Sequence, residues 1–354
     1  MKQNKRPKNS EGLQEPVGTA FQRRPRLAEE RQPYRTREFF LLLHVPLMVA
    51  VAAVALCGGC VCGNDCGRSG TSAASPNAPI AKHVVLIGVD GFGARWIPWD
   101  KMPNLRALRD GGLYATGRDS YPTSSAINWA TAFFGTVTEV HGYRNWNSAK
   151  PDVPPPPAAL DGGRLPCVFS EIRRQDPAAY TASLYTWDGI GHCQNTNTAS
   201  FVRHFSGPGR DEYPPRDKSV IDEGLKQLAH KPKLILFYQG QVDSLGHGYG
   251  WGSEKFTNAC VRVDENIGRI VEGVKKAGMW DDTVFMLVAD HGGEGTKHGL
   301  ANLNCFDIPF LVSGAPVKGK RLVEPVLLAD TAPTILSILG YEVPDAMRGR
   351  NALR

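Results

Sequence analysis

The chain has 354 residues, of which 42% are hydrophobic and 21% are charged, a composition typical of a folded globular protein rather than a disordered one. Its formal net charge is +6. Residues 1–38 contain ten Lys or Arg against five Asp or Glu, so this tail holds five of the six surplus charges. The rest of the chain is nearly neutral, and we expect no nucleic-acid-binding surface on it.

An apolar run, FFLLLHVPLMVAVAAVALC, follows the basic tail at 39–57. As a helix, its 19 residues would span about 28 Å, close to the thickness of a bilayer core. Arg35 and Arg37 precede it, so the positive-inside rule predicts a signal anchor with a cytoplasmic tail and an extracytoplasmic domain. A cleaved signal peptide, which would release a secreted protein, is the main alternative. A lipoprotein signal and a buried core helix fit less well.

Residues 58–80, rich in Cys, Gly and Ser, predict a linker, and 81–354 predict one catalytic domain. Four cysteines crowd the end of the apolar run, where acylation or disulfide bonding fits better than a zinc site. The domain holds a further, even number of cysteines, as expected for two disulfides in an oxidising compartment. These are Cys167, Cys193, Cys260 and Cys305.

Several segments of the domain are apolar enough to form strands buried on both faces. In chain order they are 83–89, 233–238, 283–289 and 308–312. Others have helical signals, including apolar residues that recur at three and four positions. These are 103–109, 125–134, 256–274 and 331–339. The alternation predicts an α/β fold with a doubly wound, mostly parallel sheet and helices on both faces. The proline-rich segment 150–166 predicts a surface loop.

Acidic and imidazole side chains follow three of the predicted strands. They are Asp90 after the first, Asp243 and His247 after the second, and Asp290, His291 and His298 after the third. Any one of them could be a helix cap or a loop residue. Together, however, they should meet at the carboxyl edge of the sheet, where clustered carboxylates require a compensating cation. Mixed Asp and His ligands suit Zn²⁺, or Mn²⁺, and six are too many for one tetrahedral ion, so we expect two metal ions.

The order of these motifs resembles the type I phosphodiesterase/nucleotide pyrophosphatase branch of the alkaline-phosphatase superfamily. The stretch YPTSSAINW at 121–129 is similar to that family's nucleophile segment, where a hydroxyl residue stands three after the proline and an Asn three after the hydroxyl. The resemblance spans roughly 83–350. It implies that Ser125 is the nucleophile, and that Asn128 and the Ser125 amide donate to the phosphoryl oxygens. Thr123 or Ser124 could instead be the functional hydroxyl, or merely cap the helix.

The resemblance also divides the metal ligands. Ser125 would join a first ion held by Asp90, Asp290 and His291, and a second ion would be held by Asp243, His247 and His298. His141 is interpreted as structural. The implied substrate is a small phosphodiester or nucleotide. In nucleotide pyrophosphatases the last metal histidine usually lies far downstream of the Asp-His pair, so nucleotide specificity does not follow. Candidate base-stacking residues are Trp129, Tyr185 and Trp187.

Three other functions remain open or are disfavoured. A phosphomonoesterase on the same fold would need an extra cation beside the phosphoryl group, and no motif indicates one. A sulfatase is disfavoured because the pattern C/S-x-P-x-R is absent around Ser125. A catalytically inactive, membrane-tethered binding protein would have lost a ligand or the nucleophile, whereas the sequence retains all of them.

Overall fold

The computed structural model describes residues 78–163, 165–207, 209 and 213–354. The predicted tail at 1–38, the predicted membrane segment at 39–57 and nearly all of the predicted linker lie outside these residues. Within the described ranges, no helix is both long enough and apolar enough to cross a bilayer.

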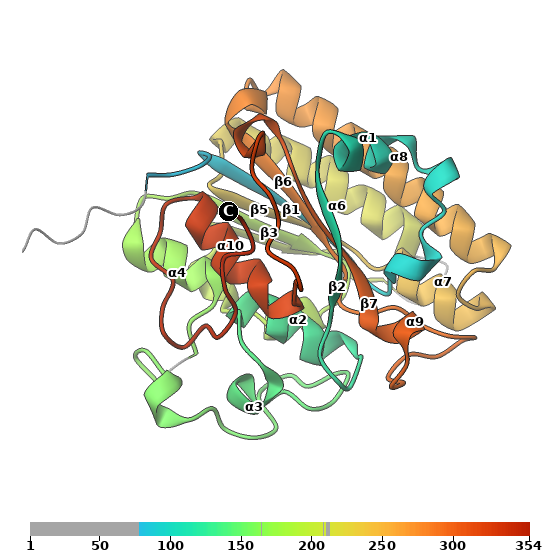
Figure 1. Cartoon of the computed structure of the whole chain (residues 1–354), viewed down its shortest axis with the longest axis horizontal. Helices are drawn as coiled ribbons and strands as arrows, with labels where there is room; N and C mark the ends of the chain where they lie inside the picture. Colours follow the sequence, from blue (N-terminus) through green and yellow to red (C-terminus); the bar gives the residue numbers. More distant parts are fainter. Residues whose placement is uncertain (1–77, 164, 208, 210–212) are drawn as a thin grey trace, which may run out of the picture. The chain divides into compact units, whose positions relative to one another are not determined.

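A seven-stranded sheet forms the centre of the domain (Figure 1). Its strands are β1 (His83–Val89), β2 (Gly112–Arg118), β3 (Thr181–Tyr185), β4 (Phe201–His204), β5 (Leu234–Gln239), β6 (Thr283–Val288) and β7 (Asp307–Ser313). Their order is β2-β7-β6-β1-β5-β3-β4, and β7 runs antiparallel to both of its neighbours. All other pairs are parallel. The prediction of a mostly parallel sheet is confirmed.

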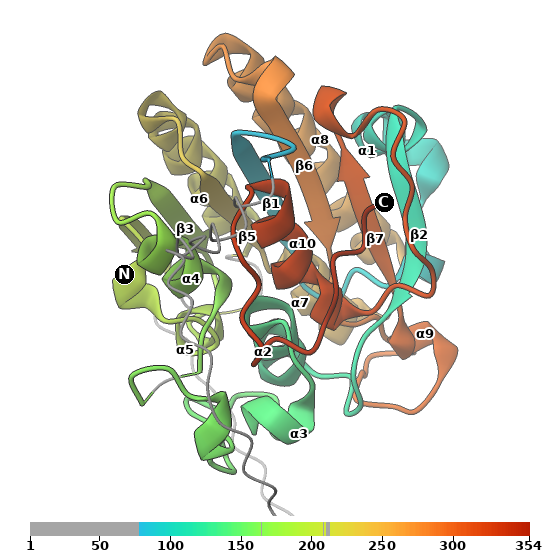
Figure 2. The same ribbon diagram turned by 60° about the vertical axis from the view of Figure 1, so that its left-hand side comes forward.

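Ten α-helices are present among the described residues. They are α1 (Pro103–Asp110), α2 (Ser125–Phe134), α3 (Thr138–His141), α4 (Val168–Gln175), α5 (Gly189–His192), α6 (Tyr213–Gln227), α7 (Gln241–Tyr249), α8 (Glu254–Lys276), α9 (Leu303–Phe306) and α10 (Thr331–Ile338). Helices α2, α4 and α10 cover one face of the sheet and α1, α6 and α8 the other, as Figure 2 shows. The predicted helices on both faces are therefore present.

The three central strands bring their carboxyl ends to the same place. Strand β1 pairs in parallel with both neighbours up to their carboxyl ends. The last pair with β5 is Val89 and Gln239, and the last pair with β6 is Gly88 and Val288. Every residue of these strands is buried, which explains their near-continuous apolar sequence. The segments that follow β1, β5 and β6 must therefore emerge side by side at one edge of the sheet.

The predicted disulfides are wrong. All four cysteines in the described domain are free and buried: Cys260 lies on α8, Cys305 on α9, Cys167 just before α4 and Cys193 just after α5. The Cys167 sulfur accepts the backbone N–H of Ser170 and so caps α4, while the Cys193 thiol donates to the Ala126 carbonyl. These thiols behave as small core residues, and their even number carries no information about the redox compartment.

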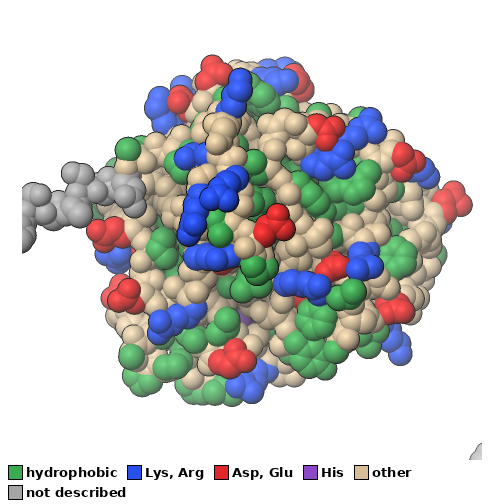
Figure 3. All heavy atoms as spheres, viewed as in Figure 1, with side chains coloured by type: hydrophobic (Ala, Val, Ile, Leu, Met, Phe, Trp, Pro, Cys, Tyr) green, Lys and Arg blue, Asp and Glu red, His purple; other side chains and the backbone are tan. Residues whose placement is uncertain are grey.

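The face in Figure 3 carries Lys and Arg side chains interspersed with Asp and Glu. This mixture agrees with the nearly neutral charge expected beyond residue 38.

Candidate active site

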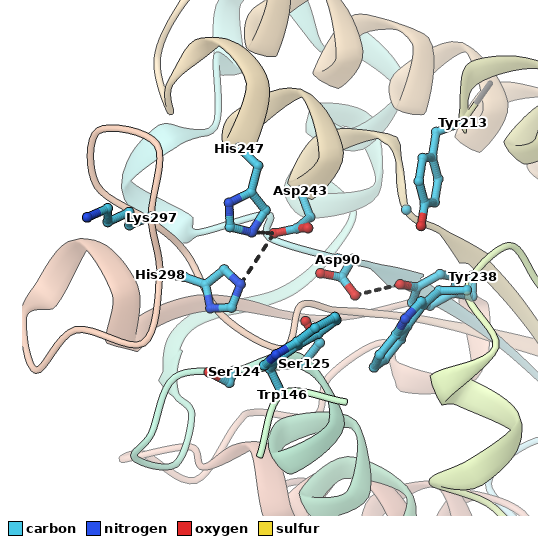
Figure 4. A pocket seen from close by; sticks show the side chains of 12 residues that line it. Asp90, Ser124, Ser125, Trp146, Tyr213, Tyr238, Asp243, His247, Lys297 and His298 are labelled. Atoms are coloured by element: carbon cyan, nitrogen blue, oxygen red, sulfur yellow. Dashed lines mark hydrogen bonds and ion pairs between the residues drawn. The ribbon is translucent and has the colours of Figure 1, made fainter. Parts of the chain in front are cut away.

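The carboxyl edge of the sheet gathers the side chains that follow β1, β5 and β6 (Figure 4). Asp90 directly follows β1, Asp290 comes two residues after β6, and Asp243 lies in the first turn of α7, which follows β5. The Asp243 N–H donates to the Asp90 carbonyl at 3.1 Å. Gly91 permits this approach: it has φ +67°, and a Cβ there would lie 2.8 Å from the Asp243 Cα. The segment after β1 can approach the first turn of α7 this closely because residue 91 is glycine.

The first predicted trio, Asp90, Asp290 and His291, is compact and buried. His291 Nε2 lies 3.7 Å from Asp90 Oδ1 and 3.2 Å from Asp290 Oδ2. Asp290 Oδ1 accepts the Gly91 N–H at 3.0 Å. The structure therefore places together the three side chains expected to hold the first ion.

The second predicted trio, Asp243, His247 and His298, also faces one point. His247 Nε2 lies 3.6 Å and His298 Nε2 4.0 Å from Asp243 Oδ1. Asp243 and His247 are four residues apart on α7 and share a face of that helix. The tightest geometric group, however, joins Asp243 and His298 with His291 rather than with His247. The His291 and His298 rings stack with centroids 3.9 Å apart, so the two trios adjoin.

All three histidines present the same nitrogen to this centre. The Nδ1 atoms of His247, His291 and His298 lie 2.8–3.0 Å from backbone carbonyls of Thr296, Gly292 and Thr123, respectively. A carbonyl only accepts hydrogen bonds, so each Nδ1 carries a proton and each Nε2, which is the remaining ring nitrogen, is left to face the centre. Burial supports the neutral form, because it lowers the pKa of His291 and that of His298 to about 3.

The donor set fits a bound cation. Among the described residues, Asp90 Oδ1 and Asp290 Oδ2 are buried and have no hydrogen-bond partner. Both face the His291 lone pair. Burial is the largest effect on both carboxyls and raises the pKa of Asp90 and, further, that of Asp290, so their ionised forms need a positive charge. Lone pairs converging in a buried site are costly unless they share a metal ion.

Ser125 lies beside the first trio. It is the first residue of α2, is only 7% exposed, and its Oγ is 3.2 Å from His291 Nε2. Ser124 extends in the N-cap position without a side-chain cap bond. Of the two serines, Ser125 is the one whose hydroxyl contacts the cluster, while Ser124 lines the pocket beside it.

Asn128 is not brought to the site. It is fully buried, and its Oδ1 accepts the Ser120 N–H at 2.9 Å. Its Nδ2 donates to the Ser120 carbonyl and to Asp119 Oδ2. The amide thus ties the loop before the nucleophile to the first turn of α2. Both amide atoms are therefore used within the protein, and the predicted role of Asn128 as a donor to a phosphoryl oxygen is not supported.

A cavity of about 510 Å³ opens over Ser125 and the second trio. Three aromatic side chains, Trp146, Trp187 and Tyr213, form part of its wall, and Lys297 lies at its rim. Of the three stacking candidates from the sequence, only Trp187 lines the cavity. Trp129 is buried beneath Asp90, and Tyr185 stacks on His204. Trp146 and Tyr213 were missed because neither belongs to a sequence motif.

Comparison with known proteins agrees with this arrangement. The profile of the family described as type I phosphodiesterase/nucleotide pyrophosphatase matches residues 84–307. A venom phosphodiesterase from Macrovipera lebetinus is 27% identical over 249 residues, which cover 64% of this chain and 27% of that protein. Ectonucleotide pyrophosphatase/phosphodiesterase family member 3 from Rattus norvegicus is 26% identical over 60% of this chain and 25% of its own length. The matched region is about a quarter of each relative.

Solved structures share the fold at lower identity. Ps i-CgsB superposes with a TM-score of 0.58 at 17% identity, covering 77% of this chain and 75% of that one. A protein in the alkaline phosphatase superfamily from Vibrio parahaemolyticus superposes with a TM-score of 0.56 at 20% identity, covering 78% and 71%. These similarities establish the architecture and carry no information on substrate.

Proposed function

Because the chain belongs to the type I phosphodiesterase/nucleotide pyrophosphatase family, we propose that it hydrolyses phosphodiester or pyrophosphate bonds. Ser125 is the proposed nucleophile, and two divalent metal ions are the proposed cofactors, Zn²⁺ above all and Mn²⁺ as the alternative. The observation that carries the proposal is the convergence of three inward Nε2 lone pairs and two buried, unpaired carboxylate oxygens beside the Ser125 hydroxyl.

The proposed division of the residues between the two ions is the one that the family resemblance implies. Asp90, Asp290 and His291 would hold the ion beside Ser125, and Asp243, His247 and His298 would hold the other. When bound, such ions lower the pKa of a coordinated hydroxyl and stabilise negative charge on the attacking and leaving oxygens. The His291 and His298 rings stack 3.9 Å apart, so the two groups of candidate ligands adjoin at one site.

In the proposed reaction, the Ser125 oxygen attacks phosphorus and displaces one ester oxygen. The seryl phosphoester that forms is then hydrolysed by water, which restores the hydroxyl and releases the second product. Ser125 lies at the start of the ten-residue helix α2, whose dipole favours the negative charge that develops at the phosphoryl group.

The cavity wall indicates the substrate class. Trp146, Trp187 and Tyr213 offer flat apolar faces within the same cavity as Ser125, and aromatic faces bind planar rings by stacking. A nucleotide or another ester with a planar group matches this wall. The named relatives, an ectonucleotide pyrophosphatase/phosphodiesterase and a venom enzyme, support this class and an extracytoplasmic location. Membrane attachment through 39–57 remains a prediction.

A phosphomonoesterase is the second candidate, but the wall favours it less. The only Lys or Arg side chain lining the cavity, within the part of the chain described, is Lys297, and Figure 4 shows its amine turned away from Ser125. A dianionic phosphoryl group would demand more positive charge there than a monoanionic diester does. A metal-loaded but inactive binding protein is the third candidate.

Turnover of chromogenic esters separates these functions. The zinc- or manganese-loaded protein should hydrolyse bis-p-nitrophenyl phosphate faster than p-nitrophenyl phosphate, and p-nitrophenyl sulfate least. Ser125→Ala should reduce diester turnover by about 10³-fold or more, because the nucleophile is lost. Ser124→Ala should retain most of it. Faster monoester turnover would favour the second candidate, and no turnover of any ester by the metal-loaded protein would favour the third.

A further inference from the structure

We infer that Trp129 and Tyr238 are positioning residues that hold Asp90 as a one-oxygen metal ligand and couple it to the nucleophile helix. The inference rests on the proposed function, because it concerns how the chain prepares the first metal site. The sequence motifs did not predict this role for either residue.

Both residues donate to the same carboxylate oxygen. Trp129 Nε1 donates to Asp90 Oδ2 at 3.0 Å, and the Tyr238 hydroxyl donates to the same atom at 2.5 Å. The other oxygen, Oδ1, is buried, accepts no hydrogen bond from the described residues, and lies 3.7 Å from His291 Nε2. The two donors thus fix the carboxylate plane and leave one oxygen directed at the candidate ion.

The surrounding packing holds the Trp129 and Tyr238 rings in place. Trp129 and Tyr238 are almost fully buried, and their rings meet edge to face with centroids 5.3 Å apart. Gly88 of β1 leaves room for the indole, because a Cβ there would lie 2.9 Å from Trp129 Cη2. A buried donor without its acceptor is costly, so the indole N–H and the tyrosine hydroxyl resist movement of Asp90.

The arrangement links the nucleophile to the ligand. Trp129 stands four residues after Ser125 on α2, so the two side chains share one face of the helix. The indole bond therefore joins the helix that carries the nucleophile to the strand end that carries Asp90. A shift of α2 would disturb the attacking oxygen and the ligand together. Removing a hydrogen bond that orients a metal ligand commonly lowers the metal affinity by about 10–100-fold.

Two conservative variants test the inference on the full chain. Tyr238→Phe removes only a hydroxyl, and Trp129→Phe removes the indole N–H. Metal-free protein is titrated with Zn²⁺ in competition with a chromogenic chelator. In each variant, one of the two zinc equivalents should bind about 10–100-fold more weakly than in the wild type. The matched controls are Tyr143→Phe, whose hydroxyl donates to the His192 carbonyl, and Trp280→Phe, which lies before the start of β6, whereas the site lies beyond its end.

Each outcome is decisive. Weaker zinc binding in Tyr238→Phe, with wild-type affinity in Tyr143→Phe, supports the positioning role. Equal zinc affinity in both variants and the wild type overturns it, because the bonds then serve packing alone. If the wild type itself takes up neither Zn²⁺ nor Mn²⁺, the proposed function fails instead. If Trp129→Phe does not fold, Tyr238→Phe, which keeps the ring, still decides the question.

Discussion

His141 should make the folded protein sensitive to mild acid, and replacing it should remove that sensitivity. The side chain is fully buried at the end of α3. Its Nδ1 accepts the Tyr143 N–H at 3.1 Å, and its Nε2 lies 3.0 Å from Thr131 Oγ1, whose proton goes to the Ile127 carbonyl. A proton on Nδ1 would face the Tyr143 N–H. The site therefore accepts only the neutral ring, and burial lowers the pKa of His141 to about 3.

The magnitude follows from proton linkage. The pKa falls from 6.5 to about 3 on folding, so below pH 6.5 the unfolded chain takes up a proton that the folded chain refuses. The stabilisation is present above pH 6.5 and is lost as pH falls toward 3. The slope approaches about 1.4 kcal/mol per pH unit, and the loss from pH 7 to pH 5 is about 2 kcal/mol.

Chemical unfolding at pH 7 and pH 5 measures this loss. His141→Gln keeps a donor and an acceptor but cannot be protonated, so its free energy of unfolding should fall by about 2 kcal/mol less than that of the wild type. Other buried histidines contribute equally to both proteins and cancel in the comparison. His192→Gln, at an exposed position, is the control and should follow the wild type. Equal losses in His141→Gln and the wild type would refute the reasoning.

The remaining predictions concern the site, the substrate, the backbone and the thiols. Chelation with EDTA should abolish diester turnover and lower the melting temperature, and added Zn²⁺ or Mn²⁺ should restore both. Trp187→Ala should raise KM for a nucleotide ester about tenfold, with a smaller effect on methyl p-nitrophenyl phosphate, because stacking is lost. Gly142→Ala should lower stability by about 2 kcal/mol or more, measured by urea unfolding, because Gly142 has φ +76° and its new Cβ would lie 1.8 Å from the Val153 carbonyl oxygen. A reducing agent should leave the melting temperature of the domain unchanged, since its cysteines are unpaired.

Sequence pattern predicted the centre of the sheet better than its margins. Strands β1, β5, β6 and β7 and helix α8 have bounds within a few residues of those expected, because burial on both faces or on one stripe leaves a strong apolar period. Strand β3, TASLY, was missed although it is entirely buried, because it includes polar residues. Ser183 in it accepts a hydrogen bond from the Gln194 side chain at 2.9 Å, and no apolar period marks a polar residue that is buried in this way.

At the site, the predicted strand ends indicated where the charged side chains converge, but not which residues surround them. The convergence of Asp90, Asp243 and Asp290 follows from parallel pairing, which the sequence makes evident. The direction of Asn128 does not, because spacing along a helix cannot distinguish a side chain aimed at a ligand from one aimed at the preceding loop. Trp146 and Tyr213 enter the cavity from segments whose paths depend on the whole fold.

The central position of β1 has a consequence for the order of assembly. Its neighbours in the sheet are made much later than β1 itself, and the Gly91 N–H meets the Asp290 carboxylate across 199 residues of sequence. A nascent chain therefore holds Asp90 and Ser125 long before their partners exist. The first trio is incomplete until residue 291 has been synthesised, and the second until residue 298. Capture of the metal ions must therefore follow the synthesis of β6, and a fragment that ends before Asp290 lacks ligands of both trios.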